Sequence, residues 1–110
     1  MATSKEYLAY IMEQLSGLEG LSHRSMMGEY IIYHKGKLAA YVCDDRLLVK
    51  PLPSALALTP SPVLEPPYPG AKDMLLVENV DDAHWLQALF AAMYDELPEP
   101  KPKKPKAKSR

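Results

Sequence analysis

The sequence predicts an α+β domain with one antiparallel sheet of about five strands and helices packed over it. Two segments have the spacing of apolar residues that is typical of amphipathic helices. One lies near the start of the 110-residue chain, and the other lies just before its Lys/Pro-rich C-terminal residues. Between them lie four short segments rich in Tyr, Ile, Val and Leu, which is typical of strands. The turns that separate these segments are too short for a crossover, so successive strands are expected to pair antiparallel. The predicted order is α-β-β-β-β-(short α)-β-α.

The first helix is expected to begin after Ser4, because its hydroxyl can accept hydrogen bonds from the unpaired amides of the first turn. Gly17 or Gly20 can end this helix, since glycine adopts the left-handed conformation at no steric cost. The apolar stripe has the i, i+3, i+4, i+7 spacing of one helix face and consists of Leu8, Ile11, Met12 and Leu15.

Four strands are predicted next, at residues 23–27, 29–34, 37–43 and 46–50. Gly36 marks a tight hairpin between the second and third of them, and Asp44-Asp45 supplies side chains that cap their own turn. Met26-Met27 are interpreted as core residues, because methionine fills irregular gaps.

Residues 51–70 contain seven prolines. Residues 54–58 are expected to form one or two helical turns, and residues 60–70 an extended surface connection. A fifth strand is predicted at residues 73–78, with a continuously apolar centre. The last helix is capped by Asp81 or Asp82 and stops at Pro98. Its apolar stripe consists of Trp85, Leu86, Leu89, Phe90 and Met93.

The formal net charge of −1 hides an uneven distribution of charge along the chain. Residues 1–97 have a net charge of −6 and are predicted to form the folded domain. Residues 98–110 have a net charge of +5, and their Lys/Pro-rich composition predicts a disordered basic tail. The six basic residues of the tail are Lys101, Lys103, Lys104, Lys106, Lys108 and Arg110.

Composition also limits the classes of protein to which the chain can belong. A hydrophobic content of 47% is ample for a globular core. One cysteine excludes an intramolecular disulfide framework and a cysteine-built zinc site, and it fits a reducing cytoplasm. No signal peptide is visible, and the longest apolar run, residues 88–94, is far shorter than the ~20 residues that span a bilayer. We therefore expect a small cytoplasmic domain with no membrane contact.

Several short motifs occur in a characteristic order from residue 26 onward. Met-Met-Gly leads into a strand, a tight turn ends in Gly36-Lys37, and an Arg-Leu-x-x-Lys strand at residues 46–50 follows an acidic turn. A Tyr-Pro-Gly-Ala-Lys segment at residues 68–72 precedes the fifth strand. In these motifs and their spacing the chain resembles the TfoX (Sxy) N-terminal domain family over residues ~4–97. The resemblance implies a curved antiparallel sheet flanked by N- and C-terminal helices.

The resemblance also implies a function. Longer members of the family regulate competence genes and are thought to act with the cyclic-AMP receptor protein at promoters. They carry a second, C-terminal helical domain, whose place the lysine-rich tail takes in this chain. The expectation is therefore a non-enzymatic regulatory or accessory module that binds a protein partner, with transcription machinery as one candidate.

Residue types that serve in catalysis are present, but each has a structural explanation. None of the histidines has a second ligand at metal-binding spacing, and the aspartate pairs fall where turns and helix caps favour aspartate. Cys43 has no neighbouring base, and the adjacent aspartates are expected to raise its pKa. We expect no enzymatic activity, no cofactor and no metal. The residues considered are His23, His34, His84, Cys43, Asp44-Asp45 and Asp81-Asp82.

Tyrosine side chains are the candidate contacts for a protein partner. Strand alternation places Tyr30 on one face of its strand and Tyr33 on the other, and Tyr68 lies in the proline-rich connection. An exposed tyrosine face is suited to binding, because aromatic side chains anchor interfaces. The alternative is that these tyrosines are half-buried sheet residues with hydroxyls in water.

The basic tail suggests an alternative function. Each lysine that neutralises a phosphate releases counterions, so the tail can bind nucleic acid weakly and without sequence preference. A tail that keeps the acidic domain dispersed explains the same residues. A homodimer formed through an exposed sheet edge is a further possibility.

Overall fold

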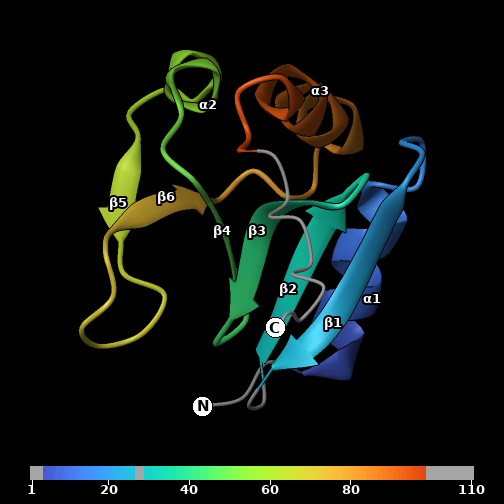
Figure 1. Ribbon diagram of the computed structural model, residues 1–110, viewed down its shortest axis with the longest axis horizontal. Helices are drawn as coiled ribbons and strands as arrows, with labels where there is room; N and C mark the ends of the chain where they lie inside the picture. Colours follow the sequence, from blue (N-terminus) through green and yellow to red (C-terminus); the bar gives the residue numbers. More distant parts are fainter. Residues whose placement is uncertain (1–3, 27–28, 99–110) are drawn as a thin grey trace, which may run out of the picture.

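The computed structural model describes residues 4–26 and 29–98 of the chain (Figure 1). No helix in this part of the chain has the length and apolar character needed to cross a membrane. In chain order, the elements within the described residues are α1 (Lys5–Gln14), β1 (Leu21–Met26), β2 (Glu29–His34), β3 (Lys37–Cys43), β4 (Arg46–Val49), α2 (Pro53–Leu58), β5 (Val63–Glu65), β6 (Met74–Val77) and α3 (Ala83–Tyr94).

All six strands form one antiparallel sheet in the order β1-β2-β3-β4-β6-β5. The predicted α+β class, the order of the expected elements and the N- and C-terminal helices are confirmed. The prediction of about five strands missed β5, which pairs with β6 inside the expected extended connection of residues 60–70. This strand is only three residues long and lies between Pro62 and Pro66, so no alternation marks it in the sequence.

Two-residue turns join β2 to β3 and β3 to β4. Both central residues have positive φ in each turn, 52° and 86° at Lys35 and Gly36 and 55° and 54° at Asp44 and Asp45. This backbone is typical of hairpins whose strands twist to the right, and aspartate tolerates it better than most side chains do. The hairpins therefore fall where the glycine and the acidic pair predicted them.

Side-chain caps begin both long helices. The Ser4 hydroxyl accepts a hydrogen bond from the Tyr7 amide at 3.1 Å, and the Asp82 carboxylate accepts one from the Trp85 amide at 3.0 Å. Ser4 also donates its backbone N–H to the Asp45 carboxylate at 3.0 Å, which joins the start of α1 to the β3–β4 turn. α1 ends at Gln14, ahead of both glycines that were expected to end it.

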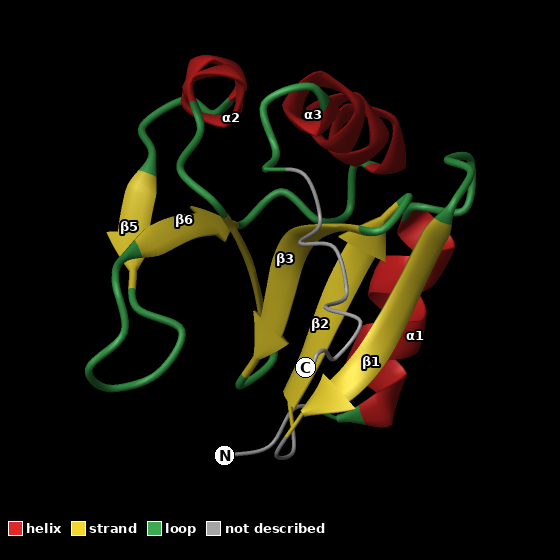
Figure 2. Cartoon of the chain, in the orientation of Figure 1, coloured by secondary structure: helices red, strands yellow, loops and turns green. Residues whose placement is uncertain are grey.

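The main core lies between one face of the sheet and the helices. Figure 2 shows α1 along β1 and β2, with α2 and α3 near the ends of the central strands. The apolar stripes predicted for the two long helices supply much of this core. Its fully buried large side chains include Ile11, Leu15, Ile32, Leu47, Leu86, Leu89, Phe90 and Met93. Met26, in contrast, is 43% exposed, so its assignment to the core was wrong, and Met27 lies outside the described residues.

A β-bulge in β3 changes which of its side chains face the core. Ile32 pairs with Ala40 and Tyr33 pairs with Leu38, so Ala39 is an extra residue without a partner on β2. Ala39 and Ala40 both pack in the main core, which only small consecutive side chains do readily. Beyond the bulge, Lys37 pairs with His34.

Lys37 and His34 are the buried polar residues of the described chain, and both contact Tyr94 at the end of α3. The Lys37 ammonium donates to the Tyr94 carbonyl at 3.1 Å and lies 4.1 Å from the centre of the Tyr94 ring. A cation is favoured there by the helix dipole and by the aromatic face. The His34 ring centre is 4.8 Å from that of Tyr94.

Burial lowers the pKa of His34 from its ordinary value of 6.5, and the positive charges of Lys35 and Lys37 lower it further. The Nδ1 atom of His34 is buried without a hydrogen-bond partner. The neutral imidazole is therefore the form that the folded domain accommodates.

The pH dependence of stability tests this assignment. As the pH falls below about 6.5, the unfolded chain takes up a proton at His34 that the folded domain excludes, so the free energy of unfolding decreases. His34→Gln is expected to reduce this decrease, measured by urea denaturation between neutral and mildly acidic pH. His23→Gln is the control and should retain it. Equal pH dependence in wild type and His34→Gln would show that His34 titrates normally.

Phe90 tests the main core, since its side chain is 1% exposed. Phe90→Ala is expected to lower the free energy of unfolding by about 3–5 kcal/mol through lost apolar burial and the cavity left behind. Circular dichroism during urea denaturation measures the change. Ala91→Ser, on the exposed side of α3, is the control and should alter the free energy by less than about 0.5 kcal/mol. A loss below about 1 kcal/mol for Phe90→Ala would contradict the described packing.

Candidate partner-binding face

The face of the sheet opposite the main core, here called the outer face, holds a second apolar cluster. Cys43, Leu48 and Met74 are buried in it, and Tyr41 and Leu76 pack against them half-buried. All five belong to β3, β4 and β6, and no helix residue of the described chain takes part. The proline-rich connection around β5 therefore has to cover part of this face.

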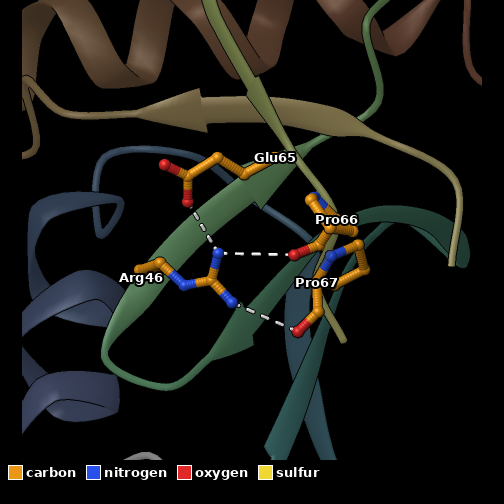
Figure 3. Close-up of polar contacts among 4 residues, drawn as sticks. All are labelled: Arg46, Glu65, Pro66 and Pro67. Carbon is orange, nitrogen blue, oxygen red and sulfur yellow. Dashed lines mark hydrogen bonds and ion pairs between the residues drawn. The ribbon is translucent and has the colours of Figure 1, made fainter. Parts of the chain in front are cut away.

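Arg46, the first residue of β4, holds that connection in place (Figure 3). Its guanidinium forms an ion pair with Glu65 at 2.8 Å and donates to the carbonyls of Pro66 and Pro67 at 3.4 and 3.2 Å. Arginine suits this position because its planar group presents several N–H donors in a fixed fork. Pro67 is buried, and the next residue, Tyr68, is 56% exposed. Arg46 thus fixes the chain that presents Tyr68.

Tyr68 lines a hollow of about 510 Å³, here called the Tyr68 hollow. Tyr41 and Met74 contribute from the strands, and Lys50 and Lys72 contribute cations. Burial raises the pKa of the Tyr41 phenol, and the nearby Tyr68, Cys43 and Tyr33 add to the rise. The Tyr41 hydroxyl is therefore a hydrogen-bond donor at neutral pH. The complete lining is Tyr41, Lys50, Pro51, Leu52, Pro67, Tyr68, Ala71, Lys72, Asp73 and Met74.

A second hollow of about 290 Å³ adjoins the first and shares Pro67 and Tyr68 with it. Its charged lining differs, because Glu29 and Asp44 accompany Arg46 there. The Glu29 carboxylate accepts a hydrogen bond from the Asp44 amide at 3.1 Å. Tyr68 consequently borders one hollow lined by two lysines and another lined by two carboxylates.

The structure separates the three tyrosines that the sequence indicated as partner contacts. Tyr30 packs against the main core, with its ring edge-on to His23 at 6.1 Å. Tyr33 is half-buried and close enough to Tyr41 to raise its pKa, and Tyr68 lies at the hollow. Tyr41 was not among the tyrosines that the sequence indicated. It pairs with Leu48 across the β3–β4 hairpin, so counting residues outward from the acidic turn would have placed both on the same face of the sheet.

The basic residues proposed for nucleic-acid contact, and the disordered tail to which they were assigned, lie outside the described residues beyond Pro98. They are Lys101, Lys103, Lys104, Lys106, Lys108 and Arg110.

Cys43 is a buried free cysteine whose pKa is raised to about 11. Burial is the main cause, Glu29 and Asp44 raise the pKa further, and Arg46 opposes them. The expected direction is confirmed, although burial rather than the adjacent acids dominates. The thiol stays protonated at neutral pH and is a poor nucleophile.

The paired carboxylates make structural contacts. Asp45 accepts from Ser4, Asp81 accepts from the Tyr10 hydroxyl, and Asp82 caps α3. Within the described residues there is no group of three or more His, Cys, Asp or Glu side chains that could hold a metal ion.

Comparison with known proteins identifies the family. The sequence pattern of the TfoX N-terminal domain matches residues 13–96, from within α1 to beyond α3. The chain is also 34% identical over 110 residues to a protein of Spirochaeta aurantia described as an uncharacterized 12.7 kDa protein in the trpE 5′ region. That match covers 99% of this chain and 96% of the relative. No solved structure matches the chain. The chain belongs to the TfoX N-terminal domain family.

Proposed function

We propose that this chain is a non-enzymatic protein-binding module that regulates or assists a macromolecular complex. Its contact surface is the outer face around Tyr68. The observation that carries the proposal is an exposed aromatic side chain bordering two hollows and presented by a connection that Arg46 holds.

The physical properties of Tyr68 support a binding role. A tyrosine offers a large contact area and a polar end, and it has few rotatable bonds to immobilise. Arg46 fixes the backbone just before it, so little further ordering is required when a partner binds. The Tyr68 hollow has the size of natural binding sites and a largely apolar lining.

The chemistry of the described residues favours recognition over catalysis. The Cys43 thiol is held protonated, and the paired aspartates cap or bridge structural elements. A general base or nucleophile needs the opposite, a group that is free to exchange protons near a substrate.

Membership of the family supports a regulatory role, because its longer members regulate competence genes and are thought to act at promoters. Transcription machinery is accordingly the proposed partner class. The single cysteine fits a reducing compartment, so we place this activity in the cytoplasm.

Weak nucleic-acid binding through residues 98–110 is the second candidate function. It rests on the six basic side chains of that segment, which would bind phosphates without sequence preference. The acidic domain would not contribute to such binding.

Affinity capture separates the two functions. Tyr68→Ala is expected to abolish recovery of a specific protein partner, since it removes the exposed anchor. Deletion of residues 98–110 should leave that recovery intact and remove any salt-sensitive, nuclease-sensitive binding of DNA. The control is Leu56→Ala, which truncates an exposed apolar residue on α2. Unchanged recovery by Tyr68→Ala would refute the proposed surface.

The contacts of Arg46 provide a second test. Arg46→Lys keeps the charge but loses the fork that reaches Glu65, Pro66 and Pro67 together. We expect faster hydrogen exchange of the amides between residues 63 and 72 and weaker partner recovery, with the circular dichroism spectrum unchanged. Arg24→Lys makes the same substitution on exposed β1 and should change neither quantity. Normal exchange in Arg46→Lys would mean that the connection is held by other contacts.

A further inference from the structure

We propose that the Tyr68 hollow binds an acidic, extended segment of the partner protein. The carboxylates of this segment contact Lys50 and Lys72, and one of its apolar side chains packs against Tyr41 and Met74. The inference rests on the proposed protein-binding function and names the chemistry that the site recognises.

The sheet brings the two lysines to the same hollow, because Lys50 directly follows β4 and Lys72 lies just before β6. Val49 pairs with Leu75 where β4 lies beside β6, and the next step of this register sets Lys50 opposite Met74. Lys72 precedes Met74 by two residues, so both lysines come from the end of the β4–β6 pair. Both side chains line the hollow together with Met74.

These two ammonium groups make no hydrogen bond or ion pair within the described part of the chain. Two other cations of the domain do have partners, since Lys37 contacts Tyr94 and Arg46 contacts Glu65. Although the domain has a net charge of −6, the two cations in this hollow outnumber its one carboxylate, Asp73, and leave one positive charge for a ligand to balance. The hollow is therefore complementary to carboxylates.

The remaining lining selects a peptide rather than a nucleic acid. Asp73 also lines the hollow, so its net charge is only +1, which suits one or two carboxylates better than a chain of phosphates. The adjoining hollow presents Glu29 and Asp44, which would repel a polyanion that extended past Tyr68. The lining also lacks placed Asn or Gln groups that read base edges.

The apolar lining supplies the second element of recognition. Tyr41, Met74, Pro67 and Leu52 surround the volume beside the lysines. An apolar side chain buried there removes its surface from water, while neighbouring carboxylates reach the ammonium groups at the edge. Methionine and tyrosine together adapt to side chains of different shape.

Fluorescence anisotropy with a defined probe tests the inference on the full chain. The probe is a fluorescein-labelled peptide in which a central Leu-Pro pair is flanked on each side by one Glu residue. A matched peptide has Gln in place of each Glu. The double variant Lys50→Gln/Lys72→Gln is expected to weaken binding of the acidic peptide about tenfold or more. Lys5→Gln/Arg24→Gln removes two exposed charges elsewhere and should leave the affinity unchanged.

Three results would overturn the inference. The first is no binding of the acidic peptide at about 1 mM, which corresponds to only about 4 kcal/mol of binding free energy. The second is equal affinity for the acidic and Gln peptides or for the wild type and the lysine variant. The third is loss of affinity for a fluorescent oligothymidylate in the lysine variant, which would assign the hollow to nucleic acid.

Partner capture distinguishes failure of this inference from failure of the proposed function. If Lys50→Gln/Lys72→Gln recovers the partner normally and Tyr68→Ala does not, the inference of an acidic partner segment is wrong. The proposed protein-binding surface then still holds. If Tyr68→Ala recovers the partner normally, the surface itself is wrong, and the inference fails with it.

Discussion

The contacts of the Arg46 guanidinium group hold the proline-rich connection against the sheet. Three helices pack in the main core on one face of the six-stranded sheet in the described chain, and a connection that contains several prolines covers part of the outer face. β5 pairs with β6, but Pro66 and Pro67, which follow it, have no backbone N–H and cannot continue this pairing as donors. Arg46 instead holds the connection by donating to two proline carbonyls and by forming an ion pair with Glu65 on β5. The burial of Pro67, the position of Tyr68 and the shape of both hollows depend on these contacts.

Lys37 makes a comparable contact with backbone on the opposite side of the sheet. The last carbonyls of a helix lack intrahelical donors, and the Lys37 ammonium donates to that of Tyr94. The bulge at Ala39 is what places Lys37 on the core side, where its ammonium reaches the end of α3. Each cation thus donates to backbone carbonyls of another segment, and each joins segments that are distant in sequence.

Local signals in the sequence were sufficient for most of the fold. Ser4 and Asp82 cap helices, and Gly36 and Asp44-Asp45 occupy two-residue turns, because these residues favour such conformations wherever they occur. The missed features depend on contacts between distant residues. β5 exists only because β6 is beside it, and the role of Arg46 depends on where the connection returns. The hollow could not be predicted for the same reason, since Tyr41, Lys50 and Lys72 meet only through the register of β3, β4 and β6.

The protonation states of the outer face decide what kind of chemistry it can perform. Burial that makes the apolar cluster stable also raises the pKa values of Cys43 and Tyr41, so both groups keep their protons at neutral pH. A protonated thiol is a poor nucleophile, and the protonated Tyr41 hydroxyl can donate a hydrogen bond. Two ammonium groups, Lys50 and Lys72, line the same hollow and attract anions. Protonated donors, two ammonium groups and an exposed aromatic ring on one face support the proposal that this face binds a partner.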